Sequence, residues 1–270
     1  MSVGVRVVCP HTTPTDRQWL HTGEGGAQAS AHLVPAVLAL LAQAGTSLAE
    51  LDALVWGCGP GSFTGLRTAA AVAQGLAYGT RPPRHPNGLP VLSVDTLLAV
   101  AEEARHQLCP PDSAPAPAHP ASAPAHPASA PTACTITALL DARMDEVYAA
   151  TYLFPDINQP QATRLGGPWL IKPEGLAGLL DNLPGDAAHT GVLAGNVFGV
   201  YGERIPPTSG PRVVAMPTAA ALLRLAPGLL AQGMATPAAQ AQPVYVRDKV
   251  AQTTAERATR PTTALTSPQP

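Results

Sequence analysis

The fold is decided by Gly57-Cys58-Gly59-Pro60-Gly61-Ser62-Phe63-Thr64-Gly65, a glycine-rich stretch that follows the apolar run Ala53–Trp56. The apolar run is typical of a buried strand. Glycine permits left-handed backbone and proline fixes φ, so the stretch itself predicts a tight turn. Residues 66–79 are small and lack proline, which predicts a helix with Thr64 as its N-cap. A strand, a glycine turn and a helix N-terminus together offer free N–H groups to an anion. The candidate phosphate-proximal residues are Gly59, Gly61, Ser62, Thr64 and Gly65.

Two familiar motifs do not fit this turn. A Walker A loop ends in Gly-Lys-Ser/Thr, but Leu66 follows Gly65, so no lysine reaches a phosphate. A hydrolase elbow needs Gly-x-Ser-x-Gly, and Pro60 stands two residues before Ser62. A tight strand-to-helix connection with packing value only therefore stays open as the alternative to an anion site.

The string Gly59-Pro60-Gly61-Ser62-Phe63-Thr64-Gly65-Leu66-Arg67 resembles the signature of the bacterial TsaB (YeaZ) family. Two further stretches, 140–148 and 245–251, agree with that family, and the resemblance spans residues 1–257 apart from one insertion. Members of the family are partners of TsaD in making N6-threonylcarbamoyladenosine on tRNA. The chain departs from the pattern at Cys58, where the family usually carries a basic or other polar residue.

The resemblance implies an α/β fold, a two-lobed actin/hexokinase-like (ASKHA) duplication. We expect an N-terminal lobe over 1–109 and a C-terminal lobe over 134–257. The intervening segment 110–133 contains a tandem heptad built from Ala, Pro, His and Ser. Such a composition builds no core and predicts a disordered linker. Residues 258–270 are predicted to form a disordered tail.

The first lobe lacks an expected element. Each half of an ASKHA fold opens with a strand, an Asp in the turn and a returning strand. The alternation of Val3, Val5 and Val7 predicts a half-buried strand that matches the returning one. We therefore expect the opening apolar strand to be missing and Met1 to be an internal methionine of a longer natural chain.

The second lobe shows the complete plan. Thr135–Asp141 is predicted as a strand, Ala142–Asp145 as a turn and Glu146–Leu153 as the hairpin partner, whereas Pro155–Pro173 is predicted as loop. In catalytic members of the fold an Asp at this turn helps to hold a metal or water near phosphates. The alternative for the group Asp141, Arg143 and Glu146 is a locally capped turn with an Arg143–Glu146 ion pair.

Gln28–Ala44 is predicted to form a helix with a broad apolar stripe. The stripe indicates either burial on two sides or one face for the sheet and the other for a partner. Family resemblance implies that this helix and the small-residue helix pair with TsaD, or with a second copy of the same chain. The predicted interface consists of Leu33, Val37, Leu40, Leu41, Leu66, Ala69, Ala70 and Ala73. We expect Leu40→Glu or Ala70→Glu to abolish pairing and to leave the monomer folded.

Other features limit the chemistry. The formal net charge is −2 and no Lys/Arg cluster is present, so we expect contact with tRNA only through a complex. The four cysteines have no Cys-x-x-Cys spacing and no His-Glu-x-x-His string occurs, so no metal site is predicted. No apolar run is long enough to predict a membrane span, which makes a cytoplasmic protein the default.

Two functional classes remain. The first is a non-catalytic subunit without a cofactor of its own, which pairs with TsaD while its loop borders an ATP or ADP site in the complex with the TsaE ATPase. The second is a stand-alone nucleotide-dependent phosphotransferase or ATPase that uses the glycine loop and Asp141. The missing lysine and the missing first acidic turn favour the first class.

Overall fold

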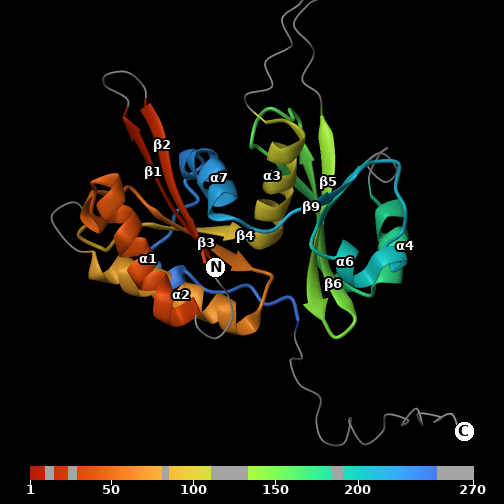
Figure 1. Cartoon of the computed structure of the whole chain (residues 1–270), viewed down its shortest axis with the longest axis horizontal. Coiled ribbons are helices and arrows are strands. Elements are labelled where there is room, and N and C mark those ends of the chain that lie inside the picture. Colours follow the sequence, from red (N-terminus) through yellow and green to blue (C-terminus); the bar gives the residue numbers. More distant parts are fainter. Residues whose placement is uncertain (10–14, 24–28, 81–84, 111–132, 184–190, 248–270) are drawn as a thin grey trace, which may run out of the picture.

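A computed structural model describes residues 1–9, 15–23, 29–80, 85–110, 133–183 and 191–247. They form two α/β lobes that lie side by side (Figure 1). The predicted linker 110–133 and tail 258–270 fall almost wholly outside the described residues. The strands are β1 (Ser2–Cys9), β2 (Thr15–Thr22), β3 (Leu54–Gly59), β4 (Val91–Asp95), β5 (Cys134–Arg143), β6 (Glu146–Phe154), β7 (Thr163–Ile171), β8 (Val192–Gly195) and β9 (Arg212–Val214). The helices are α1 (Ala29–Ala44), α2 (Phe63–Gly79), α3 (Thr96–Leu108), α4 (Leu176–Asp181), α6 (Phe198–Tyr201) and α7 (Ala219–Ala231).

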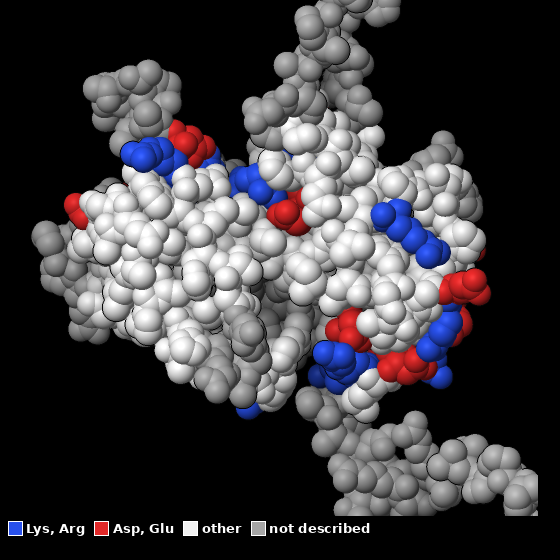
Figure 2. Space-filling model, in the orientation of Figure 1, with Lys and Arg blue, Asp and Glu red and all other residues white. Residues whose placement is uncertain are grey.

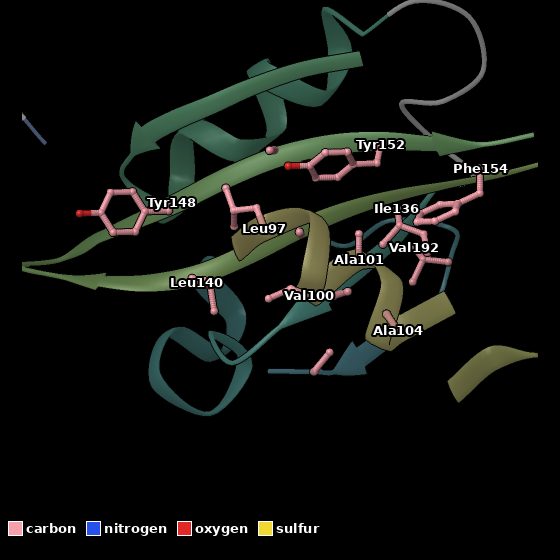
Figure 3. Close-up of a cluster of buried hydrophobic side chains, with 14 of the residues drawn as sticks. Leu97, Val100, Ala101, Ala104, Ile136, Leu140, Tyr148, Tyr152, Phe154 and Val192 are labelled. Atoms are coloured by element: carbon pink, nitrogen blue, oxygen red, sulfur yellow. The ribbon is translucent and has the colours of Figure 1, made fainter. Parts of the chain in front are cut away.

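The second lobe contains one continuous sheet in the order β7-β6-β5-β8-β9. Strand β5 is central; it pairs antiparallel with β6 and parallel with β8. Helix α3 covers one face of this sheet, where Leu97, Val100 and Ala101 pack against Ile136 and Phe154 (Figure 3). Helices α4 and α6 cover the other face. Burial on both faces explains why β5 reads as a nearly continuous apolar run.

The sheet of the first lobe is divided into two pieces. Strands β1 and β2 form an antiparallel pair and β3 and β4 a parallel pair, and the two pairs are not hydrogen-bonded to each other. When the strand orders of the two lobes are compared, the pair β2-β1 corresponds to β7-β6 and the pair β3-β4 corresponds to β8-β9. No strand of the described residues occupies the position equivalent to the central strand β5. The prediction of an ASKHA duplication whose first lobe lacks its opening strand is thereby confirmed.

A cavity of about 230 Å³ lies at this position. Its walls come from β1 and β3, which carry the open strand edges, and from α1, α2 and α7. Most of its lining is apolar, including Val5, Leu41, Trp56 and Leu222. Unpaired strand edges and missing packing on the lining both destabilise a sheet, so the first lobe is less stable here than a continuous sheet would be.

The helices do not follow the predicted division of the chain into lobes. Helix α3 belongs to the first segment but packs into the core of the second lobe. Helix α7 belongs to the second segment, yet its Leu225 and Ala226 pack against Leu92 and Val94 of β4. The boundary at 110–133 therefore divides the chain in sequence but not in packing, because α3 packs in the second lobe and α7 packs in the first. Helices α1 and α2 lie next to each other on the outer side of the first lobe (Figure 1).

Strand β7 was not predicted, and the assignment of Pro155–Pro173 to loop is wrong. The breaker Gly166-Gly167-Pro168 lies inside the strand. Strand β7 is the edge of its sheet, and its register with β6 shifts on both sides of Thr151. A proline and an irregular ladder are tolerated on an edge strand, since no partner on the outer side needs the missing donor.

Candidate functional site

The inner face of α1 is part of the core. Leu40 is 3% exposed and Leu41 is 4% exposed, and both pack against Val3 and Val5 of β1. Neither side chain can reach a partner while the lobe stays folded. Their assignment to a partner interface is wrong, and Leu40→Glu would place a charge in the core and unfold the lobe.

Helix α2 likewise buries one face in the core and exposes the other. Its buried residues are Leu66, Ala70, Ala73 and Ala77. Ala70 and Ala73 belong to a core cluster with Trp56 of β3, so these assignments to the interface are also wrong. Leu33, Val37 and Ala69 are half-buried and pack against core clusters, so at most their edges reach the surface.

The outward faces of the two helices are mostly apolar or small, although Ser30, His32 and Gln43 of α1 and Thr64 and Arg67 of α2 are also exposed. On α1, Ala31, Leu38 and Ala42 are exposed, and Leu38 is 51% exposed. On α2, Ala71 and Gly75 are exposed. Figure 2 shows this side of the first lobe nearly free of Lys, Arg, Asp and Glu. The periodicity of α1 does not show which face turns inward, because apolar residues occur on every side of the helix.

The glycine stretch is shorter as a turn than predicted. Strand β3 continues through Cys58 to Gly59, and α2 begins at Phe63 with Ser62, not Thr64, at its N-cap position. The Gly59 amide donates a hydrogen bond to the Thr96 hydroxyl at 2.9 Å. Gly59 has φ +127°, and a Cβ there would lie 2.5 Å from the Val244 carbonyl oxygen. Only glycine fits this position.

Cys58 lies inside the sheet and is not an exposed loop residue. It is 7% exposed. Burial raises the pKa of its thiol to about 11, and the nearby negative charge of Asp95 adds to the rise. A thiol with this pKa is neutral and unreactive at physiological pH. Cys58, the residue that departs from the family pattern, therefore has a packing role in the core.

The β5–β6 turn is held by a dense set of contacts. Arg143, Met144 and Asp145 all have positive φ, between 55° and 65°. The carboxylate of Asp141 accepts hydrogen bonds from the Arg143 amide at 2.8 Å and from the Tyr201 hydroxyl at 2.9 Å. Burial raises the pKa of Tyr201 to about 12, and the hydrogen bond to Asp141 contributes to the rise. Three consecutive left-handed residues without glycine are strained, and such turns persist where surrounding contacts fix them.

The expected Arg143–Glu146 ion pair is not formed. Arg143 pairs with Asp141 at 3.2 Å instead. Glu146 pairs at 2.6 Å with Arg247, which lies about a hundred residues later in the chain and was not a predicted site residue. The predicted capping of Asp141 by its own turn is confirmed, and only the pairing of the other two residues is wrong.

The structure brings the glycine loop and the β5–β6 turn to one cavity of about 520 Å³ between the lobes. Gly61, Ser62 and Thr96 contribute to one wall, and Asp141 and Asn196 to the other. The Asn196 side chain accepts a hydrogen bond from the Asp141 amide at 2.9 Å. The Thr96 hydroxyl, the Asn196 side-chain oxygen and the Asp141 carboxylate thus already have partners in the chain, whereas Ser62 makes no side-chain capping hydrogen bond. No nucleophile with an adjacent base is assembled among these wall residues.

The described residues contain neither a membrane-spanning helix nor a candidate metal-binding cluster. None of the helices in this part of the chain is long and apolar enough to cross a membrane. No group of three or more His, Cys, Asp or Glu side chains in the same ranges is placed to hold a metal ion.

Two lobes with related strand orders, a glycine loop and a hairpin turn facing each other across a cleft define an actin/hexokinase-like protein. The family model described as "TsaD: tRNA N6-adenosine threonylcarbamoyltransferase" matches residues 20–189, more than half of the chain. The structure of YeaZ from Pseudomonas aeruginosa is similar with a TM-score of 0.67 and 30% identity, covering 90% of this chain and 94% of that one. The chain belongs to the TsaB (YeaZ) family of this class.

Characterised relatives agree with this assignment. The tRNA threonylcarbamoyladenosine biosynthesis protein TsaB of Escherichia coli is 29% identical over 221 residues, which cover 81% of this chain and 80% of that protein. The protein of the same name from Haemophilus influenzae is 27% identical over 225 residues, which cover 81% and 79%.

Proposed function

We propose that this chain is a non-catalytic subunit in the synthesis of N6-threonylcarbamoyladenosine on tRNA, and that it pairs with a TsaD homologue. The names of its relatives support the pathway. The proposed pairing with TsaD is supported mainly by the uncharged outward side of α1 and α2 (Figure 2). Helix α1 contains no Asp, Glu, Lys or Arg, and α2 contains only Arg67. A surface helix that has no charged side chain and exposes mostly apolar or small residues is typical of one that is covered by another protein.

The small residues on α2 allow a close approach. A Cβ added at Gly75 or Gly79 would meet nothing within 4 Å, so the chain itself leaves these positions open. A helix from a partner can approach such positions closely, and the exposed Leu38 of the neighbouring helix α1 can serve as an apolar anchor. A TsaD homologue is the occupant we propose, and a second copy of this chain is the competing one.

The experiment is co-purification with a TsaD homologue. Leu38→Glu and Ala71→Glu should abolish it and leave the melting temperature unchanged, because both residues are exposed. Val200→Glu is the matched control, since Val200 is 61% exposed on the second lobe, away from α1 and α2. Retained binding by both first-lobe variants would refute the proposed surface. Size-exclusion chromatography with light scattering on the free chain distinguishes a homodimer.

The alternative is a stand-alone nucleotide-dependent enzyme that uses the interlobe cleft. It is the weaker candidate because the Asp141 carboxylate is held by Tyr201 and Arg143. ATP turnover by the purified chain alone, compared with turnover in the presence of TsaD and TsaE homologues, separates the two. We propose that any ATP or ADP site lies at the interface of that complex, and that tRNA contacts the chain only there. Sustained hydrolysis by the chain alone would support the enzyme.

A further inference from the structure

A short segment near the end of the described chain, Val244–Arg247, crosses from one lobe to the other. At the first lobe, the Val244 amide donates a hydrogen bond to the Cys58 carbonyl at 2.8 Å. The Tyr245 ring lies 4.9 Å from the Phe63 ring, centroid to centroid, and its hydroxyl accepts a hydrogen bond from Arg67 Nε at 3.2 Å. This end of the segment thus contacts both β3 and the first turn of α2.

The other end of the segment is fixed to the second lobe. The Arg247 guanidinium forms a 2.6 Å ion pair with Glu146, and its side chain is only 14% exposed. The same guanidinium donates to the carbonyl oxygens of Ala142 and Arg143 at 3.1 Å and 3.3 Å. Between the two ends, Val246 packs against the core of the second lobe. Arg247 therefore fastens the segment to the strained β5–β6 turn.

The lobes are also joined by a second, separate set of contacts. Glu102 of α3 pairs with Arg224 of α7, and the Tyr152 hydroxyl donates to Asp95 at 2.8 Å. These contacts involve the helices that the lobes exchange, and none of these four residues lines the cleft. Val244–Arg247, in contrast, lines the cleft together with the glycine loop and the β5–β6 turn.

We propose that Val244–Arg247 is an interlobe clasp, which sets the opening of the cleft and couples the glycine loop to the β5–β6 turn. The clasp joins the two cleft walls through residues other than those that pair the exchanged helices, so the lobes are held by two separate sets of contacts. Motion of one wall is then transmitted to the other through Tyr245 and Arg247. The clasp acts in the free chain, and its test does not depend on a partner.

The test is hydrogen exchange of the full chain, followed in peptides that cover 57–66 and 139–148. Tyr245→Ala touches only the first lobe, and Glu146→Gln touches only the second. Each should raise exchange in both peptides, by roughly five- to thirty-fold if the clasp carries the coupling. Glu146→Gln keeps the side-chain shape at a half-buried position, so its fold is retained even if Tyr245→Ala proves too disruptive.

Arg204→Ala is the matched control. Arg204 binds Asp145 in the same turn and Glu174, and among the described residues its ion pairs, hydrogen bonds and ring contact all stay within the second lobe. It should raise exchange in 139–148 and leave 57–66 unchanged. If Glu146→Gln and Tyr245→Ala each change only the peptide of their own lobe, Val244–Arg247 makes two local contacts and the clasp is refuted.

Discussion

Replacement of Glu102 by glutamine tests the charged network that joins α3 to α7. Glu102 is 0% exposed. Its carboxylate accepts hydrogen bonds from Arg105 at 2.6 Å and 2.9 Å and from Arg224 at 2.6 Å. Glutamine has the same shape but no charge, so Arg105, whose side chain is 5% exposed, would be left in the core without a counter-ion.

The size of the effect follows from this burial. Removing one partner of a buried ion pair costs about 3–5 kcal/mol, and we expect the lower end because glutamine retains one acceptor oxygen. In a chain of this size each kcal/mol lowers the melting temperature by about 2–4 °C, so Glu102→Gln should lower it by roughly 6–12 °C. The double variant Glu102→Gln/Arg105→Met should recover part of the loss, because it removes the orphaned charge.

The assay is urea unfolding followed by circular dichroism, with Glu103→Gln as the neighbouring control. Glu103 accepts from Thr218 and pairs with Arg224, but its side chain is 18% exposed. Water can replace part of its contacts, so its replacement should cost about 1 kcal/mol or less. Equal effects of the two substitutions, or a loss below about 1 kcal/mol for Glu102→Gln, would refute the reasoning.

Two further predictions follow from burial in the first lobe. Leu40→Ala should lower the free energy of unfolding by about 2–4 kcal/mol in urea, whereas Leu38→Ala on the outer face should change it by less than about 0.5 kcal/mol; similar losses would contradict the assigned helix orientation. Burial raises the pKa of the Cys58 thiol from its ordinary value of 9.0 to about 11 in the folded state. The Cys58 thiol therefore stays protonated to a higher pH in the folded state than in the unfolded state. The free energy of unfolding should fall as pH rises from about 9 to about 11. Cys58→Ala should remove that part of the pH dependence, and an unchanged slope would show that the thiol is not the cause.

The architecture was largely predictable because its signals are local. The alternation in Val3–Val7, the glycine turn and the β5–β6 hairpin each depend on neighbouring residues, and they lie where the sequence places them. Strand β7 was missed because Gly166-Gly167-Pro168 breaks any strand pattern, and only its position at a sheet edge makes the proline acceptable.

The candidate site was less predictable because its contacts are distant in sequence. Arg143 and Glu146 are close enough along the chain to suggest a pair, but Arg247 competes for Glu146 from a separate segment. The inward face of α1 is decided by which residues meet Val3 and Val5, and no periodicity within an apolar helix contains that information. The glycine loop and the β5–β6 turn were each predicted, and the fold then places them on one cleft.

The state of the polar groups at the cleft favours the interaction role over catalysis. A catalytic cleft needs polar groups that are free to bind substrate or transfer protons. Here the Thr96 hydroxyl accepts from Gly59, Asp141 is held by Tyr201 and Arg143, and Arg247 is fastened to the opposite turn. The contacts of Asp141 hold the turn within the second lobe, and Arg247 joins that turn to the segment whose Val244 contacts the first lobe. The large surface with no such internal role is the uncharged outer side of α1 and α2, and a partner that covers it would bury apolar area without having to displace a single ion pair made by α1.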